Sequence, residues 1–169
     1  MFNSKQELRN WVKATRKTYS NCSNILVEKL RETELYKSSK NIMIFYPLDG
    51  EINLLSLLDD VDKKFYLPKI SGKDLLCCCY SKGDELCESC FKTNEPLTNP
   101  CDKLLIDLVI VPALCCDINN YRLGYGGGFY DRFLEDFRGN TICCIPKKYL
   151  IETVFPENHD KKIDLIITD

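Results

Sequence analysis

The chain has 169 residues, of which 44% are hydrophobic and 28% are charged, and its formal net charge at pH 7 is −2. This length suits one domain with a single core, and the composition excludes disordered and fibrous proteins. A general nucleic-acid binder would carry a basic excess, and no apolar run approaches the roughly 20 residues that span a bilayer. We therefore expect one soluble domain over residues 1–169, located in the cytoplasm, without nucleic-acid or membrane partners and without need for more than a monomer.

The first forty residues are predicted to be helical. Apolar side chains recur there at helical spacing among Lys, Arg and Glu, at Leu8, Trp11, Val12, Ile25, Leu26, Leu30 and Leu35. Ser4 can cap the first helix, and Glu7 three residues later completes a capping box. Lys5 and Arg9 would then share one face of this helix, because they lie four residues apart.

Short apolar runs in the rest of the chain predict strands that alternate with helices. The expected strands are Ile42–Tyr46, Phe65–Leu67, Leu75–Tyr80, Leu104–Val111, Thr141–Ile145 and Ile163–Ile167, and the expected helices are Ile52–Leu58 and Phe129–Phe137. The run Leu104–Val111 is typical of a strand that is covered on both faces. Residues 81–100 are polar and indicate a long excursion outside the core. The pattern predicts an α/β fold, a three-layer α/β/α domain around a mostly parallel sheet.

A glycine-rich segment follows the strand predicted at Leu104–Val111. Residues 122–132 read Arg-Leu-Gly-Tyr-Gly-Gly-Gly-Phe-Tyr-Asp-Arg, directly before a predicted helix. Glycine permits positive φ and close approach of a ligand, and free N–H groups in such a loop bind anions. In open α/β sheets, ligands bind beyond the carboxyl ends of the strands, where this loop would lie. The alternative is a flexible glycine-rich turn, because the segment matches neither a Walker A loop nor the usual place of a dinucleotide fingerprint.

Eleven cysteines are many for such a chain. Those at Cys77–Cys79, Cys115–Cys116 and Cys143–Cys144 lie in apolar runs, as expected of small buried hydrophobic side chains. Cys87 and Cys90 form a C-x-x-C, which is half of a zinc site, but no second half has matching spacing. We therefore expect neither a zinc site nor a disulfide framework.

Residues 106–114, Asp117 and residues 122–134 together resemble the 5-formyltetrahydrofolate cyclo-ligase family, whose members are also called methenyltetrahydrofolate synthetases. Further matches follow in the same order along nearly the whole chain: Lys5-x-x-Leu8-Arg9, Phe45-Tyr46-Pro47 with Glu51, Leu67-Pro68-Lys69, Glu95-Pro96, and Phe155-Pro156-Glu157-x-His159-Asp160 with Asp164. The glycine segment is highly specific, and the other matches are individually modest. The resemblance implies conversion of 5-formyltetrahydrofolate to 5,10-methenyltetrahydrofolate, with MgATP consumed and ADP and phosphate released.

In the chemistry that this resemblance implies, the formyl oxygen is phosphorylated, N10 attacks the activated carbon, and phosphate leaves. Such a reaction needs positioning and charge neutralisation rather than a protein nucleophile. The implied ATP-binding residues are Lys5, Arg9, Arg122, Leu123, Gly124, Tyr125, Gly126, Gly127, Gly128, Phe129 and Tyr130. The implied catalytic residues are Arg122, Tyr130 and Asp131. From spacing alone, Lys5 and Arg9 can also be ordinary solvated helix cations, and Arg122 a surface arginine before a turn.

The resemblance also implies magnesium ligands, Asp131 and Asp160. Two aspartates are enough, because Mg²⁺ usually takes only one or two protein carboxylates and keeps several waters. Asp131 equally suits charge compensation at a helix start. Asp160 equally suits a polar turn, and Asp164 is then the substitute ligand.

Tyr46, Glu51, Phe129 and Tyr130 match substrate-contacting positions of the family on the folate side. A carboxylate such as Glu51 accepts hydrogen bonds from pteridine N–H groups, and aromatic side chains pack against the flat ring. Plain core packing is the alternative for Tyr46 and Phe129. The implied ligands are therefore a reduced folate, ATP and Mg²⁺.

Two departures from the family pattern concern the site. Gly127 stands where some members carry a basic residue, so other cations must hold the phosphates. Lys92-Thr93 replace a Gly-Ile element before Glu95-Pro96. Fold analogy alone also permits a small-molecule kinase or a non-catalytic nucleotide- or sugar-phosphate-sensing domain. A sensing domain would be expected to lack Asp131 or the N-terminal cations, but these residues are present. A kinase would be expected to have a base for an acceptor hydroxyl, and we find no obvious candidate.

Overall fold

Three helices precede the first strand in the computed structural model, which describes residues 2–16, 20–89 and 91–169. They are α1 (Lys5–Thr15), α2 (Ser20–Glu32) and α3 (Glu34–Ser38). The Ser4 hydroxyl accepts a hydrogen bond from the backbone N–H of Glu7 at 3.2 Å, which confirms the predicted cap of α1. The other half of the capping box differs, because the Glu7 carboxylate accepts from the backbone N–H of Asn3 instead of Ser4.

A mixed sheet of seven strands forms the centre of the molecule, in the order β12-β10-β7-β1-β2-β3-β6. The strands are β1 (Asn41–Met43), β2 (Lys64–Ser71), β3 (Asp74–Tyr80), β6 (Pro100–Cys101), β7 (Leu108–Ile110), β10 (Asn140–Ile145) and β12 (Leu165–Thr168). All neighbouring pairs from β12 to β2 are parallel, and β3 and β6 join antiparallel. The chain therefore has an α/β fold with N-terminal helices and a mostly parallel sheet.

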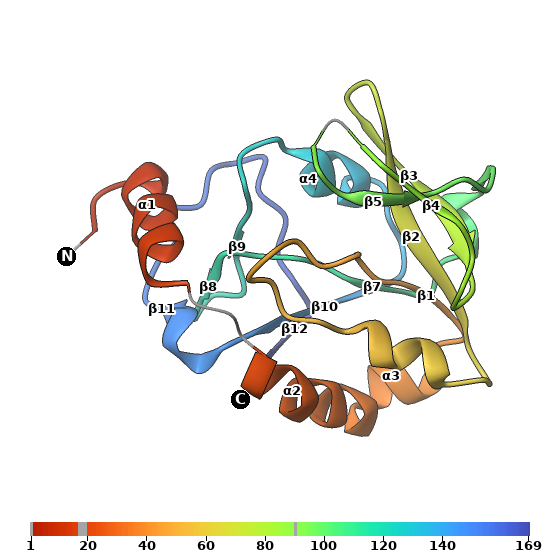
Figure 1. Ribbon diagram of the computed structural model, residues 1–169. Helices are drawn as coiled ribbons and strands as arrows, with labels where there is room; N and C mark the ends of the chain where they lie inside the picture. Colours follow the sequence, from red (N-terminus) through yellow and green to blue (C-terminus); the bar gives the residue numbers. More distant parts are fainter. Residues whose placement is uncertain (1, 17–19, 90) are drawn as a thin grey trace.

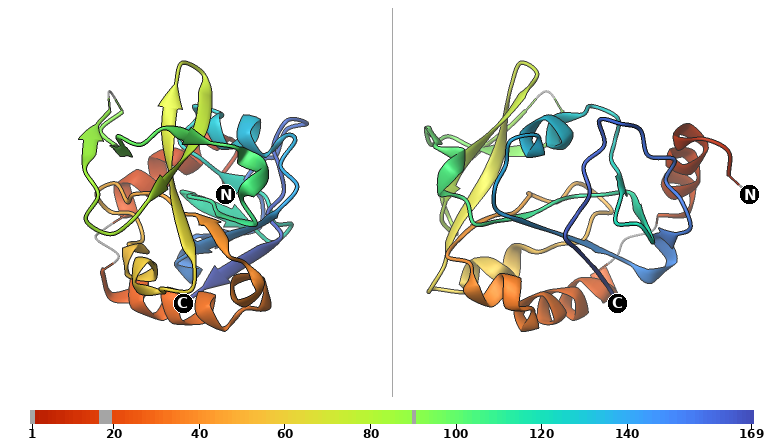
Figure 2. Two further views of the ribbon diagram at one scale, coloured as in Figure 1. Left: turned by 90° about the vertical axis from the view of Figure 1, so that its right-hand side faces the viewer. Right: turned by 180° about the vertical axis from the view of Figure 1, so that it is seen from behind.

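Helices cover both faces of this sheet (Figures 1 and 2). Along β7 and the residue that follows it, Leu108 and Ile110 pack in a cluster with α2 and α3, whereas Val109 and Val111 pack in a second cluster with α1 and α4 (Phe129–Leu134). This alternation buries the central strands on both sides, as the continuous apolar run predicted. A small sheet of β11 (Leu150–Ile151), β8 (Cys115–Asp117) and β9 (Arg122–Leu123) extends the second cluster toward α1.

Several element boundaries differ from the predictions. The run from Leu104 does not start as a strand: Lys103–Leu105 form a 3₁₀ turn, η2, and Leu104 is 71% exposed. The Asp102 carboxylate caps this turn by accepting from the Leu104 N–H at 2.9 Å, a local bond that competes with strand pairing. The predicted helix Ile52–Leu58 is a 3₁₀ helix, η1 (Leu55–Asp59), and α4 ends at Leu134 rather than at Phe137.

The polar excursion at residues 81–100 contains a β-ribbon, β4 (Leu86–Glu88) paired with β5 (Asn94–Pro96). This ribbon is not remote from the core, since β5 also lies against β2. Its bounds were missed because the segment has few apolar residues and its strands are only three residues long.

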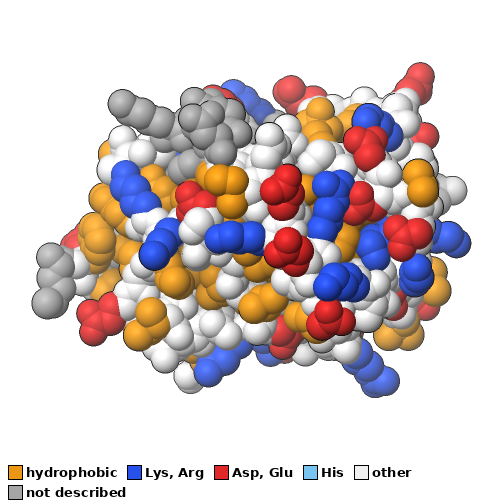
Figure 3. Space-filling model, turned by 90° about the horizontal axis from the view of Figure 1, so that it is seen from below, with side chains coloured by type: hydrophobic (Ala, Val, Ile, Leu, Met, Phe, Trp, Pro, Cys, Tyr) orange, Lys and Arg blue, Asp and Glu red, His pale blue; other side chains and the backbone are white. Residues whose placement is uncertain are grey.

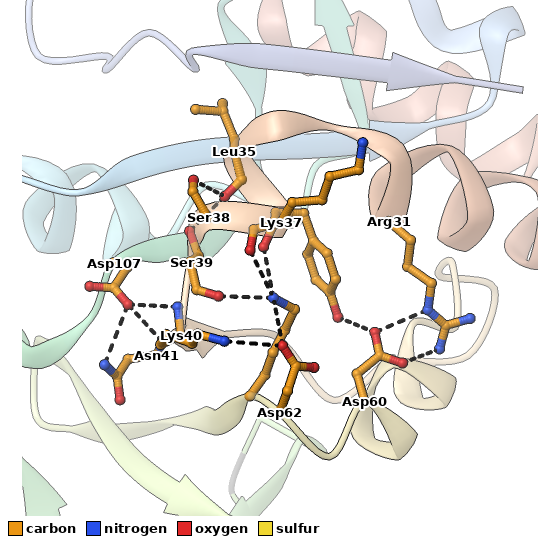
Figure 4. Close-up of polar contacts among 12 residues, drawn as sticks. Arg31, Leu35, Lys37, Ser38, Ser39, Lys40, Asn41, Asp60, Asp62 and Asp107 are labelled. Carbon is orange, nitrogen blue, oxygen red and sulfur yellow. Dashed lines mark hydrogen bonds and ion pairs between the residues drawn. The ribbon is translucent and has the colours of Figure 1, made fainter.

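Asp107, the one charged residue in the run Leu104–Val111, aligns two central strands. Its carboxylate accepts from the backbone N–H groups of Lys40 at 2.9 Å and Asn41 at 2.7 Å (Figure 4). Burial alone would raise the pKa of Asp107, but these donors lower it below its ordinary value. In the same region Asp60 accepts from the Tyr36 hydroxyl at 2.6 Å. These bonds join the start of β1 to the start of β7. Because the two strands are parallel, their carboxyl ends lie at the same edge of the sheet.

Acidic and basic side chains are interspersed on the face that carries α2 and α3 (Figure 3). Among the described residues, no helix combines the length and the apolar composition needed to cross a membrane. The ten cysteines in the described ranges are free thiols, and six of them are buried: Cys77, Cys78, Cys115, Cys116, Cys143 and Cys144. Cys79 is exposed, so the interpretation as buried hydrophobic side chains holds for two members of the triplet.

Candidate functional site

A cavity of about 440 Å³ lies beyond the carboxyl ends of β1 and β7. Apart from the substitute ligand Asp164, its lining includes every site residue predicted from the sequence: Lys5, Arg9, Tyr46, Glu51, Arg122, Leu123, Gly124, Tyr125, Gly126, Gly127, Gly128, Phe129, Tyr130, Asp131 and Asp160. Figure 1 shows α1 on one side of this region and the β4–β5 ribbon on the other, with the segment from β9 to α4 between them. Segments that are far apart in sequence therefore converge on one site.

The glycine segment needs its glycines for two different reasons. Gly126 and Gly128 have φ values of 102° and 66°, a region that side chains with a Cβ rarely adopt. Gly127 has no positive φ, but a Cβ there would lie 2.8 Å from ring atoms of Phe129. The helix that follows, α4, has only six residues. A bound anion would therefore be held by loop N–H groups and nearby cations more than by a helix dipole.

Arg122 and Asp131 form an ion pair at the two ends of this segment. Arg122 Nη2 donates to Asp131 Oδ1 at 2.8 Å, and the side chains are 4% and 19% exposed. The guanidinium carbon also lies 5.7 Å from the ring centroid of Tyr130. Arg122 Nε is buried and, among the described residues, has no hydrogen-bond partner. A buried donor without an acceptor is costly, so this atom fits a site for an anionic ligand.

Lys5 and Arg9, two of the three cations of α1, line the cavity. Lys5 Nζ lies 2.6 Å from Asp160 Oδ2 and 3.2 Å from Glu157 Oε1. Arg9 Nε donates to the carbonyl of Gly124 at 3.1 Å. Of the two interpretations left open by spacing, solvated helix cations or site residues, these contacts favour the second.

Asp131 and Asp160 each keep one carboxylate oxygen available. Asp131 Oδ2 and Asp160 Oδ1 accept no hydrogen bond from the described residues. Burial alone would raise the pKa of Asp160, but hydrogen bonds from Lys5 Nζ and the Glu157 N–H lower it, so this carboxyl group is ionised at neutral pH. Two carboxylates with free oxygens fit Mg²⁺, which takes few protein ligands.

Glu51 belongs to a polar network that the sequence did not indicate. Its Oε1 accepts from the Tyr125 hydroxyl at 2.5 Å, and its Oε2 accepts from the Leu48 N–H at 2.8 Å. Arg16 lies 3.8 Å from the same carboxylate and donates to the Tyr125 hydroxyl at 2.6 Å. Burial first, and then the charge of Glu51, raise the pKa values of Tyr125 and Tyr130, so both phenols keep their protons at neutral pH. Arg16 was missed because nothing in its local sequence links it to a loop 34 residues away.

An apolar wall completes the cavity on the side of β2, β3 and the β4–β5 ribbon. It consists of Pro68, Ile70, Leu75, Phe91 and Phe129. Phe91 and Phe129 meet edge to face, with ring centroids 5.6 Å apart. The same ribbon contributes Thr93, Asn94 and the buried carboxylate of Glu95. Phe91 and Glu95 were missed as site residues because they lie in the segment interpreted as an excursion.

No group of three or more His, Cys, Asp or Glu side chains that could hold a metal occurs among the residues described. Cys90, one half of the C-x-x-C pair with Cys87, lies outside those residues. Asp164, the substitute magnesium ligand, instead accepts from the Thr141 backbone N–H and hydroxyl, each at 2.8 Å. It is not among the residues that line the cavity, so the structure favours Asp160 over Asp164 as the partner of Asp131.

Comparison with known proteins is consistent across sequence and structure. The chain is 33% identical to 5-formyltetrahydrofolate cyclo-ligase of Escherichia coli over 106 residues, which are 57% of this chain and 58% of that protein. It is 29% identical to the Haemophilus influenzae protein of the same name over 136 residues, 73% and 72% of the two chains.

A solved structure of Aquifex aeolicus 5,10-methenyltetrahydrofolate synthetase superposes with a TM-score of 0.85 and 27% identity, covering 97% of this chain and 89% of that one. The Mycoplasma pneumoniae 5,10-methenyltetrahydrofolate synthetase has the same fold, with a TM-score of 0.74 at 20% identity and coverage of 98% of both chains. The model of the 5-formyltetrahydrofolate cyclo-ligase family matches residues 2–169. The chain therefore belongs to the 5-formyltetrahydrofolate cyclo-ligase family.

Proposed function

We propose that the protein converts 5-formyltetrahydrofolate and ATP into 5,10-methenyltetrahydrofolate, ADP and phosphate, with Mg²⁺ as the metal. The observation that carries this proposal is the buried Nε of Arg122 in the wall of the cavity, which has no partner among the described residues. A guanidinium whose Nη2 is held by Asp131 and whose Nε has no partner retains an unused donor, and a phosphate oxygen is a suitable acceptor for it. Family membership supports the substrate class.

The phosphates of ATP lie, in this proposal, between α1 and the glycine segment. Lys5 and Arg9 approach from α1, and Arg122 approaches from β9. Backbone N–H groups of residues 124–128 are the remaining donors, and the positive φ of Gly126 and Gly128 leaves this backbone open to the ligand. Leu123, Tyr125, Phe129 and Tyr130 complete the nucleotide contacts. Asp131 and Asp160 hold Mg²⁺, which supplies further neutralisation of phosphate charge when bound.

Two bonds form and three break as the folate reacts. The formyl oxygen attacks the γ-phosphorus, and the bond from that phosphorus to ADP breaks. N10 then attacks the formyl carbon and loses its proton, which leaves with the phosphate as the carbon–oxygen bond breaks, and this yields the methenyl bridge. Arg122 neutralises the transferring phosphoryl group, and Tyr130, protonated at neutral pH, donates a hydrogen bond to its oxygens. Tyr46, Glu51 and the aromatic rings of Phe129 and Tyr130 hold the folate, so the formyl group meets the phosphate in line.

We also propose that the enzyme works as a monomer in the cytoplasm. All residues assigned above come from one chain, so the chemistry does not require a second copy. The sulfur atoms of Cys116 and Cys143 lie 3.5 Å apart as thiols, which fits a reducing compartment.

The test combines purified protein, 5-formyltetrahydrofolate and MgATP, with methenyl absorbance and ADP release followed in parallel. We expect both signals to rise in equal amounts and neither to rise without ATP. Arg9→Met should raise the KM for ATP roughly 10- to 100-fold, because a charge-assisted contact is worth about 1.5–3 kcal/mol. Lys13→Met on the exposed face of the same helix is the matched control and should leave that KM unchanged. ATP binding or ADP release without methenyl absorbance would overturn the proposal and favour a sensor or a kinase.

A further inference from the structure

Glu95, in the wall of the cavity, is a buried carboxylate with one unused oxygen. It lies on β5 and is 6% exposed. Its Oε1 accepts from the Ile70 N–H at 3.2 Å and from the Thr93 hydroxyl at 3.4 Å. Its Oε2 accepts no hydrogen bond from the described residues, and Glu95 lines the cavity. The unused oxygen is therefore free to accept hydrogen bonds from a ligand.

Four carboxylates line the cavity, and within the described part of the chain three of them have a cationic partner. Asp131 pairs with Arg122, Asp160 with Lys5, and Glu51 with Arg16. No ion pair between described residues includes Glu95. A buried carboxylate without a counter-ion or enough donors costs several kcal/mol, on the order of the penalty for desolvating an ion. The missing donors of Glu95 are therefore to be found on a ligand.

Glu51 is less free to accept from a ligand. Both of its oxygens already accept hydrogen bonds, from Tyr125 and from the Leu48 N–H, and its charge is balanced by Arg16. New N–H donors at Glu51 would have to share or displace these contacts. At Glu95 they would meet an oxygen without a competitor among the described residues.

The surroundings of Glu95 fit a flat ligand with a polar edge. Ile70 and Thr93 adjoin the carboxylate, and the paired rings of Phe91 and Phe129 belong to the same wall. This wall lies across the site from α1 (Figure 1), and Lys5 and Arg9 of α1 also line the cavity. A ligand that spans the cavity would thus place its anionic part at α1 and an N–H-bearing ring at β5.

We propose that Glu95 is the specificity-determining residue for the pteridine ring, and that its Oε2 accepts the adjacent N–H donors of the 2-amino group and N3. This inference rests on the proposed function, because it takes the substrate to be a reduced folate. A site built around such donors rejects analogues that lack them, since the buried carboxylate is then left unpaired. Glu95 touches the part of the substrate that does not react, so its loss affects recognition rather than phosphoryl transfer.

The test pairs Glu95→Gln with Glu88→Gln, which changes an exposed glutamate on the neighbouring strand β4. In E95Q the new amide oxygen can still accept from the Ile70 N–H, but the amide NH₂ group opposes the N–H donors of the ring. We expect E95Q to raise the KM and the Kd for 5-formyltetrahydrofolate at least 30-fold, because a buried charged acceptor is replaced by a donor, at a cost of about 2 kcal/mol or more. The KM for ATP should stay within about twofold and the Tm close to that of the wild type, and E88Q should change none of these values.

A second arm changes the ligand. A 2-desamino analogue of the folate should bind the wild type about tenfold or more weakly than the parent compound, while E95Q should bind the two nearly equally. Equal binding of both compounds by the wild type overturns the proposal, and this result does not depend on how E95Q folds. Equal losses of folate and ATP affinity with a lowered Tm in E95Q also overturn it, because they indicate a structural role. A wild type that forms no methenyl product refutes the proposed function, whereas an active wild type with an unchanged E95Q refutes only the role of Glu95.

Discussion

The ion pair between Arg122 and Asp131 predicts an asymmetry between two substitutions that break it. Asp131→Asn leaves the guanidinium of Arg122, which is 4% exposed, without a charged partner. Arg122→Met leaves the carboxylate of Asp131, which is 19% exposed and can still be hydrated. Breaking a buried pair costs about 3–5 kcal/mol when the remaining charge stays dry. We therefore expect a loss of about 3 kcal/mol for Asp131→Asn and about 2 kcal/mol for Arg122→Met, the value of a charge-assisted hydrogen bond.

The double variant has no unpaired charge, so its loss should be smaller than the sum of the single losses. We expect a coupling of about 2 kcal/mol, within the range for residues in direct contact. Urea unfolding without ligands measures these free energies, and Trp11, the single tryptophan, is a suitable fluorescence probe because it packs 5.2 Å from the ring of Tyr149. By thermal unfolding, Asp131→Asn should lower the Tm by about 6–12 °C, at roughly 2–4 °C per kcal/mol for a chain of this size.

The exposed Arg138 supplies the matched control, and Arg138→Met should stay within about 0.5 kcal/mol of the wild type. Two results would refute the reasoning. One is a larger loss for Arg122→Met than for Asp131→Asn, which would mean that the burial of the remaining charge does not set the cost. The other is additivity of the single losses within about 0.5 kcal/mol, which would mean that the pair is not coupled in solution.

Two further predictions concern the sheet and the loop. Asp107 has a lowered pKa in the folded protein, so its contribution to stability is present above the unfolded pKa and is lost as pH falls through the folded one. Asp107→Asn should lower the free energy of unfolding by about 1 kcal/mol at pH 7 and by progressively less below about pH 4. Urea unfolding measures this loss, and an equal loss at pH 7 and below about pH 4 would contradict the reasoning. Gly127→Ala places a Cβ 2.8 Å from ring atoms of Phe129, so it should lower kcat/KM for the folate about tenfold or more by moving this wall. Gly72→Ala is the control, since its φ of 61° with open space predicts a loss of about 1 kcal/mol in stability and no change in KM.

Local patterns in the sequence predicted much of the fold and of the candidate site. The apolar spacing placed α1, and Ser4 was recognised as its cap because the bond from Ser4 to Glu7 spans only three residues. The glycine segment indicated an anion site because positive φ is a property of single positions. Local patterns failed at Leu104 and Leu105, where a capped 3₁₀ turn leaves two leucines in solvent although the run resembles a strand. An apolar side chain favours transfer out of water, but it does not specify which neighbouring residue covers it in the fold.

The sequence by itself determined the family, the alternation of strands and helices, and the residues of the glycine segment with its bracketing Arg122 and Asp131. Only the tertiary structure decided which groups already have partners. It placed Arg16 on Glu51, left Arg122 Nε without an acceptor among the described residues, and brought Glu95 to the cavity from a segment interpreted as an excursion. The reason is physical: helix caps and positive φ are set by neighbours along the chain, whereas the pairing of a buried charge depends on contacts between segments that only folding brings together.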